Sequence, residues 1–513
     1  MIWDGQYDGI KEAHAFFRHM RVPEQCSGEM LIAELQRTFC FSELDDAFIQ
    51  NTGSKLLKAL RQDNDEDAAW LSNFFDVIAR YPVSAKQSTK HDIAYVIPLI
   101  PKIAMFSSPR RVTKRNADDD RTTDRSWKPG LFVKECLSYC VAKDEIDDLF
   151  KTIQENPNIS DNEDLFAKFL DEKIRRALKK YLDLDVNSKL IGNSFGDQKD
   201  CYMPQSVRDR IEAAPFKRFA DDIRAVLAIK PFVSRRQFVA MLESLVRIAT
   251  SAHVLWLCNI NRKLEDAVFR VLKGQSEALT ESDLFDALNM PANGVLSYGS
   301  NFQIRIREFF KQYERSTKRL CFLLYKVKDI SELPQTTLDW STPEAFLKSV
   351  ALIADYVKSH TDFLTEFETE FSAHYMESIK KYSLSVDSQS THLLRFVLTT
   401  LIQNSQPKEV RYARYDQSYF VRHRTHSNRS AVIVSAGAVS LMTLVHCCSY
   451  RNGTVLLSNL TDALQNYGIT IPAGETMDRF KKQLRELGLT IDSPDAESGM
   501  VLQDIVSVCE GGL

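Results

Sequence analysis

Hydrophobic residues recur at helical spacing along most of the chain. After Ser234, apolar side chains fall three and four positions apart from Phe238 to Ala249, which predicts a long helix that starts at Ser234. Similar spacing predicts a helix near 282 and another over about 302–327. Thr342-Pro343-Glu344 is a favourable helix start, and the run after it continues to about 382 with a break near His360 or Thr361. The pattern therefore predicts a mainly α, multi-helical body.

The last part of the chain has a different pattern. It predicts an apolar helix around 439–445, a short strand at 454–457, and a second helix that Ser458 caps and that stops at Gly468. A third helix is predicted from Glu475 to Leu487, followed by a hairpin of strands 489–491 and 500–502. This order of elements is that of a winged helix.

Length and composition suggest how these elements are grouped. At 513 residues the chain is too long for one hydrophobic core, so several domains are expected. Residues 107–130 are rich in charge and poor in apolar side chains, which is typical of a polar loop; it is either a phosphate-contacting arm or a solvated loop. The expected units are an N-terminal helical domain (1–106), the polar loop (107–130), a helical domain (131–232), a long-helix domain (233–407), a basic Arg/Tyr-rich connector (408–436) and a winged-helix-like domain (437–513).

The connector is the most strongly basic stretch. Residues 408–429 hold six Lys and Arg against two acids, although the whole chain has a net charge of −3. Cations neutralise phosphates and aromatic rings stack on bases, so this composition predicts contact with double-stranded DNA. The candidate DNA-binding residues here are Lys408, Arg411, Arg414, Tyr415, Arg422, Arg424 and Arg429. The alternatives are an exposed connector with solvated cations, or a docking surface for the acidic helix expected at 362–370.

The third helix of the tail adds three further candidates. Its predicted buried face is Met477, Phe480, Leu484 and Leu487, and the opposite face is predicted to carry Arg479, Lys482 and Gln483, which suit guanine, phosphate and adenine groups. Residues 437–506 of this domain are acidic, with eight acids against five basic residues, and three of the acids lie in the wing. A winged helix of this kind often docks proteins. Any DNA contact would therefore depend on the third helix and the connector.

Catalytic and metal-binding patterns are not evident. Asp171-Glu172-Lys173 echoes a nuclease motif, but it falls on a predicted helix, and none of the common hydrolase or kinase motifs is present. The ten cysteines are dispersed without a CxxC pair, which favours reduced buried thiols over a metal site. We therefore expect a non-enzymatic protein without cofactor or metal.

The N-terminus lacks the pattern of a signal peptide, and the apolar stretch 238–258 is interrupted by Glu243 and Arg247. This stretch is expected to be a buried core helix, and the protein is expected to be cytoplasmic and to lie off the membrane.

One family resemblance is carried by the tail. The end of the second helix, Tyr467-Gly468-Ile469, is followed by Leu484-Arg485-Glu486-Leu487-Gly488-Leu489 and then Ser493-Pro494-Asp495-Ala496. This region resembles the C-terminal region of the G component of phosphorothioate-dependent restriction systems and of related accessory proteins of bacterial modification-associated phage-defence islands. The resemblance implies a mostly helical protein that acts beside ATPase or helicase partners. Two functions follow as hypotheses: a non-catalytic DNA-binding or DNA-targeting subunit of a defence complex, or an adaptor whose winged helix docks an ATPase or helicase.

Overall fold

The computed structural model describes a subset of the chain. The described residues are 55–56, 58–79, 149, 152, 165–183, 214–291, 294–328, 330–333, 338, 343–383, 389–403, 416–425, 431–491 and 500–504. The polar loop predicted at 107–130 and most of the N-terminal domain predicted at 1–106 lie outside these residues.

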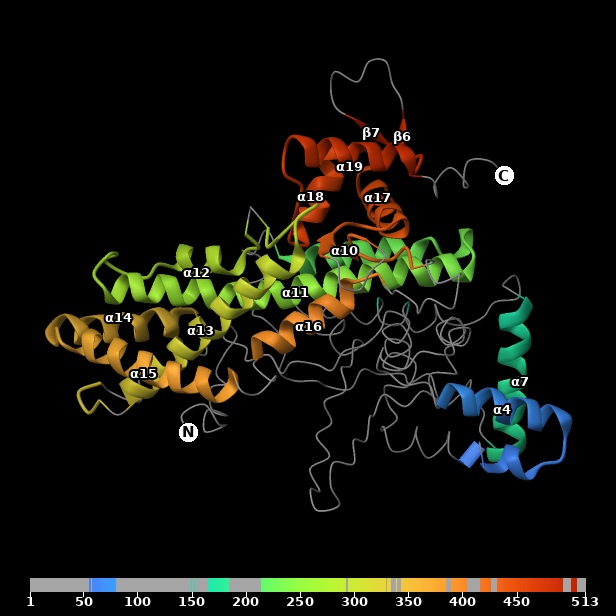
Figure 1. Cartoon of the computed structure of the whole chain (residues 1–513), viewed down its shortest axis with the longest axis horizontal. Coiled ribbons are helices and arrows are strands. Elements are labelled where there is room, and N and C mark those ends of the chain that lie inside the picture. The colour runs from blue at the N-terminus through green and yellow to red at the C-terminus, as the bar shows by residue number, and fades with distance from the viewer. Residues whose placement is uncertain are drawn as a thin grey trace.

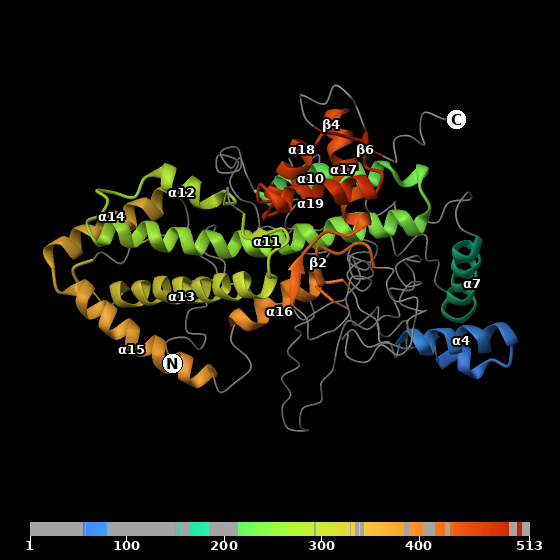
Figure 2. The ribbon, with the colours of Figure 1, turned by 45° about the horizontal axis from the view of Figure 1, so that its top comes forward.

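The described protein is mainly helical, and α11 (Arg235–Leu272) is its longest helix (Figure 1). α13 (Phe302–Lys328) and α10 (Pro215–Ala228) pack against α11, as do α12 (Glu281–Leu288), α14 (Pro343–Ser359) and α16 (Gln389–Leu401). α15 (Phe363–Ser383) packs on α13, and a 3-10 turn (Lys230–Phe232) joins α10 to α11. α11 and α13 lie side by side in Figure 2.

Several helix boundaries confirm the sequence predictions. The Ser234 side chain accepts a hydrogen bond from the Gln237 N–H at 3.2 Å and caps α11. The predicted break near His360 is also confirmed, because α14 ends at Ser359 and α15 begins at Phe363. The apolar part of α11 is long enough to cross a membrane by length and composition, but most of it is buried inside the protein. It is therefore a core helix here, as expected.

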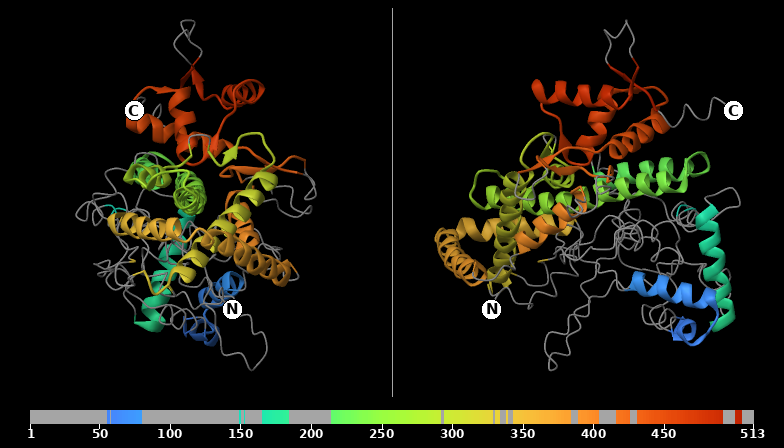
Figure 3. Two further views of the ribbon diagram at one scale, coloured as in Figure 1. Left: turned by 90° about the vertical axis from the view of Figure 1, so that its left-hand side faces the viewer. Right: turned by 45° about the vertical axis from the view of Figure 1, so that its right-hand side comes forward.

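The helices α4 (Glu66–Ala79) and α7 (Leu165–Leu182) lie earlier in the chain than α10. Lys173 of α7 forms an ion pair with Asp67 of α4, and Lys180 of α7 forms one with Asp63, just before α4. Figure 3 shows these two helices on the other side of α11 from the C-terminal helices. They are thus remote from the tail that carries the candidate residues.

The C-terminal unit, residues 438–502, contains three helices and a small sheet. Its order is α17 (Ala438–Asn452), β4 (Val455–Leu456), α18 (Leu457–Asn466), β5 (Ile469–Thr470), α19 (Glu475–Glu486), β6 (Thr490–Ile491) and β7 (Val501–Leu502). β7 lies between β4 and β6 and is antiparallel to both. The predicted elements are confirmed, with one correction: α18 starts at Leu457, so Ser458 lies inside its first turn and does not cap it. The Asn459 side chain accepts the Leu456 N–H instead, at 2.8 Å.

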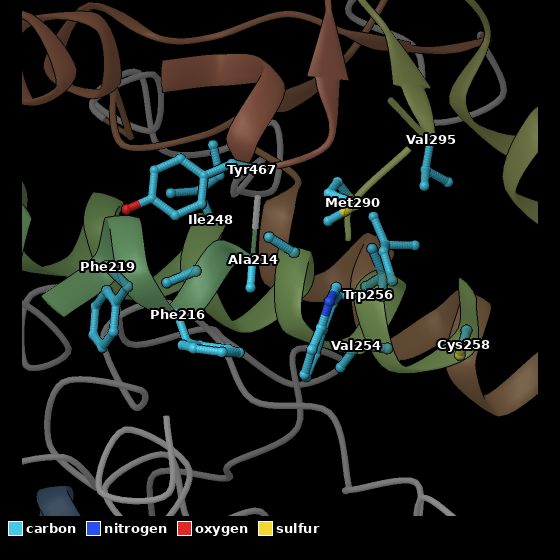
Figure 4. Packing of buried hydrophobic residues seen from close by; sticks show 14 of the residues in the cluster. Ala214, Phe216, Phe219, Ile248, Val254, Trp256, Cys258, Met290, Val295 and Tyr467 are labelled. Carbon is cyan, nitrogen blue, oxygen red and sulfur yellow. The ribbon is translucent and has the colours of Figure 1, made fainter. Parts of the chain in front are cut away.

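The C-terminal unit shares a continuous hydrophobic core with the body. α17 packs on α10 and α11, and the Tyr467 ring lies over α10 and close to Ile248 of α11 (Figure 4). The buried carboxylate of Asp222 on α10 accepts the Tyr467 O–H at 2.8 Å and the Arg218 Nε–H at 2.8 Å. Because buried polar groups need partners, the bond from Tyr467 favours one orientation of the unit on α10.

A backbone strap, residues 295–301, ties the C-terminal unit to the body a second time. Its strand β1 (Leu296–Ser297) pairs in parallel with β5, with Leu296 opposite Ile469. The same strap then runs beside β3 (Val432–Val434), where Asn301 bridges Ile433. At the entry to the strap, a Cβ on Gly294 would stand 2.8 Å from the Gly468 carbonyl oxygen, so only glycine fits this close approach.

Candidate nucleic-acid interface

A β-hairpin occupies the end of the basic connector. β2 (Val421–His423) pairs antiparallel with β3, and Arg422 lies opposite Ile433. Val421 and Val434 are buried against the core, whereas Arg422 and, just beyond β2, Arg424 are exposed. Alternation along the strand therefore directs Val421 inward and Arg422 toward solvent.

The hairpin is anchored to α11 by a buried ion pair. Arg247 is completely buried, and its Nη1 lies 3.1 Å from Asp416 Oδ2 and 3.2 Å from the Ser418 carbonyl oxygen. Glu243 supplies a second acid, 2.9 Å from Nη2. The Ser418 hydroxyl in turn donates to the Ala240 carbonyl oxygen at 3.0 Å. Since Asp416 is engaged with Arg247 in the interior, its charge does little to offset the arginines at the surface.

The two aromatic residues just before β2 point into the protein. Tyr419 is 8% exposed and Phe420 is 1% exposed. Burial raises the pKa of Tyr419, while the nearby positive charge of Arg422 acts in the opposite direction. The rings of Tyr419 and Phe420 in the basic connector are therefore not available for base stacking, because both side chains are part of the core.

Tyr298 of the strap joins the hairpin to α19. Its hydroxyl donates to Gln483 Oε1 at 2.6 Å and accepts the Ala436 N–H at 3.2 Å, and its ring contacts Phe480 with centroids 5.1 Å apart. Burial raises the pKa of Tyr298, and the charge of Arg422 opposes that rise. Through Tyr298 the structure thus links Gln483 of α19 to Ala436, which follows β3.

Gln483 holds α19 in place. Its Nε2 donates to the Ala436 carbonyl oxygen at 2.9 Å, while its Oε1 accepts from Tyr298. The sequence pattern predicts that Gln483 lies on the face of α19 opposite the core, but both ends of its amide are bonded to the body of the protein. Reading an adenine edge would require these two bonds to break.

The outward face of α19 has both signs of charge. Phe480 and Leu484 are fully buried, as predicted, while Met477 and Leu487 are only half-buried. Arg479 is exposed and pairs with Glu475 at 3.0 Å, and Lys482 is exposed and lies 3.8 Å from Glu486. Arg479 and Lys482 each have an acid one helical turn away. The positive electrostatic field of the outward face of α19 is therefore weak compared with that of the hairpin.

The acidic helix that was the alternative target of the connector has other partners. Glu368 of α15 pairs with Arg319 of α13 and lies 3.8 Å from Lys273, and Glu370 pairs with Lys326. These contacts place the acids of α15 against α13, so they hold the helical body together.

Histidine and acidic residues that could suggest chemistry have structural partners. His446 lies 2.9 Å from Asp504 Oδ2 through Nδ1 and 3.2 Å from the Ala225 carbonyl oxygen through Nε2, in the core as predicted. Lys173 and Glu172 of the nuclease-like triplet form ion pairs with Asp67 and Arg176 on the surface of α7. Within the described residues, no group of three or more His, Cys, Asp or Glu could hold a metal ion.

Half of the predicted DNA-binding residues fall outside the described structure. Those residues are Lys408, Arg411, Arg414, Tyr415 and Arg429. Of the others, Arg422 and Arg424 share the hairpin, Arg479 and Lys482 share the outer face of α19, and Gln483 lies at the junction between them. The chain matches no known family profile and no curated protein.

Proposed function

We propose that the protein binds duplex DNA without acting on it chemically, and that the hairpin contacts the phosphate backbone. The observation that carries this proposal is the pair of exposed arginines, Arg422 and Arg424, on a hairpin whose own acid, Asp416, is engaged with buried Arg247. A rigidly held cation loses little conformational entropy when it meets a phosphate, so anchoring favours binding. Phosphate contacts supply most of the sequence-independent affinity for DNA.

The C-terminal unit supports the same proposal through its topology. The succession α17-β4-α18-β5-α19-β6-β7, with β7 between β4 and β6, supports a winged-helix assignment. We assign the unit to that class and α19 to the position of its recognition helix. Because Gln483 is bonded inward and the outer cations of α19 have acidic neighbours, we expect α19 to contribute less than the hairpin to DNA affinity.

We propose that the protein is a non-catalytic targeting subunit of a bacterial defence complex. An ATPase or helicase partner would supply the catalytic activity of that complex. This setting rests on the resemblance of the tail sequence to accessory components of modification-dependent restriction. The balanced charges on α19 favour a second role for the same unit, which is docking of that partner. An Arg479→Glu/Lys482→Glu variant that lost a partner while keeping its DNA affinity would support the docking role.

Fluorescence anisotropy with a labelled duplex tests the DNA proposal. Each phosphate contact contributes about 0.9 to the slope of log K against log salt. Between 1 M and 0.15 M salt, one such contact therefore strengthens binding about five-fold. Arg422→Ala/Arg424→Ala is therefore expected to bind roughly twenty- to thirty-fold more weakly. The matched control is Lys328→Ala/Lys348→Ala, which removes two exposed cations from the far end of α13 and from α14. Equal affinities of the two variants would contradict the proposal.

A further inference from the structure

α13 carries two kinds of cation along its length. In its C-terminal half, Lys318 pairs with Glu314 at 3.0 Å, Arg319 pairs with Glu265 and Glu368, and Lys326 pairs with Glu370. The ion pairs of Arg319 and Lys326 hold α13 against α11 and α15, and that of Lys318 lies within α13. The basic residues nearer its N-terminus are different.

Arg307, Lys311 and Arg315 are spaced four residues apart, so they form one stripe along α13. All three are exposed, and none of them forms an ion pair with an acid among the described residues. The stripe therefore does not serve to bind α13 to its neighbours, and its charge faces solvent.

The acids near this stripe do not neutralise it. Glu314 is bonded to Lys318 and to the Ser390 N–H, which donates to its Oε2 at 3.4 Å. Glu308 is exposed and accepts from Gln312 at 3.5 Å, so one carboxylate stands beside three cations. The local balance is thus positive by two charges.

The fold places the stripe next to the hairpin. Asn301, which accepts the Gln303 N–H at the start of α13, bridges Ile433, and Ile433 lies opposite Arg422. In Figure 2 the hairpin strand β2 lies by the end of α13 that begins at Phe302. Arg307 is only six residues beyond Asn301, so the stripe starts close to the hairpin.

α16 supports this arrangement from the other side. Ser390, near the start of α16, contacts Glu314 in the middle of α13, and Ile402, just past the end of α16, bridges Val421 of β2. α16 therefore runs antiparallel to α13 and ends at the hairpin, which fixes the distance between the hairpin and the stripe.

We infer that Arg307, Lys311 and Arg315 bind the phosphate backbone of the same duplex that the hairpin holds. The stripe spans about 12 Å at 1.5 Å per residue, which is the axial rise of three to four nucleotides at about 3.4 Å each. Three cations over this length match up to three phosphates of one strand. This placement rests on the DNA binding proposed above, and it makes the binding surface continuous from β2 along α13.

The test compares three full-length variants by anisotropy over a range of salt concentrations, with a labelled duplex of about 25 base pairs. Arg307→Ala/Lys311→Ala/Arg315→Ala removes two to three phosphate contacts, so it is expected to lower affinity about thirty- to 150-fold at 0.15 M salt and to lower the slope of log K against log salt by about 1.8 to 2.7. Arg307→Lys/Arg315→Lys keeps the charges and is expected to bind like the unaltered protein, which excludes a folding defect as the cause. Lys328→Ala/Lys348→Ala is the control.

The outcomes separate the two proposals. If Arg422→Ala/Arg424→Ala weakens binding and the stripe variant does not, the stripe assignment is overturned and the hairpin assignment stands. If the stripe variant weakens binding and the hairpin variant does not, the stripe assignment stands and the hairpin assignment fails. An unaltered protein that shows no salt-dependent binding to the duplex overturns both.

Discussion

Replacement of Asp416 by Asn tests whether the hairpin is anchored as described. Asn keeps the shape of the side chain and removes the charge that faces Arg247. Both carboxylate oxygens lie within reach of Arg247 Nη1, at 3.1 and 3.3 Å, and Arg247 is completely buried, so solvent screens this pair little. Hydrogen bonds between charged groups contribute about 1.5–3 kcal/mol, and Glu243 still neutralises part of the charge. We expect a loss of about 2 kcal/mol in the local stability of the hairpin.

Hydrogen exchange of peptides that cover residues 416–425 and 431–436 measures this loss. A change of about 2 kcal/mol corresponds to roughly thirty-fold faster exchange of protected amides. The control is Asp355→Asn, which breaks an exposed pair with Lys358 and is expected to change stability by less than about 0.5 kcal/mol. Exchange in Asp416→Asn that matched that of the unaltered protein would refute the anchoring role of the ion pair.

Three further expectations concern the attachment of the C-terminal unit. A Cβ at Gly437 would stand 2.2 Å from the Gln417 carbonyl oxygen, so Gly437→Ala is expected to cost about 1–3 kcal/mol in urea unfolding; a cost near zero would show that the segment before the hairpin moves freely. Tyr467→Phe removes the hydrogen bond to Asp222 and is expected to lower the free energy of unfolding by about 1 kcal/mol, a value that an unchanged urea midpoint would contradict. Burial raises the pKa of Cys447 well above its ordinary value, so its thiol stays protonated in the folded protein. In the unfolded chain the thiol ionises above about pH 8.5, so the stability that the buried thiol contributes is complete below that pH and falls as the pH rises further. Mass-spectrometric mapping of alkylation at about pH 8 should find this thiol unreactive in the folded protein, and rapid native labelling would contradict the packing of α17.

The helical body was predictable from the sequence because its signals are local. The three- and four-residue spacing after Phe238, the Ser234 cap and the break near His360 each depend on residues a few positions apart. The same holds for the order of elements in the tail. The apolar face of a helix, or the stop at Gly468, can be recognised without knowing what packs against it.

The candidate site depends on contacts that no local pattern reveals. Arg247 and Asp416 are separated by 169 positions, and Tyr298 and Gln483 by 185. Position 483 lies three residues after Phe480 and next to Leu484, so helical geometry puts it at the edge of the buried stripe, and Tyr298 covers that edge. Charged residues dominate the composition around Tyr419 and Phe420, but the backbone that leads into β2 packs both rings into the core.

The salt dependence of DNA binding is the sharpest test of whether the hairpin contacts phosphates. For the unaltered protein, log K for a labelled duplex should fall linearly with log salt, and for Arg422→Ala/Arg424→Ala the slope should be smaller by about 1.8, which corresponds to two phosphate contacts at about 0.9 each. Equal slopes for the two proteins, or binding that does not change with salt, would contradict the proposed phosphate contacts.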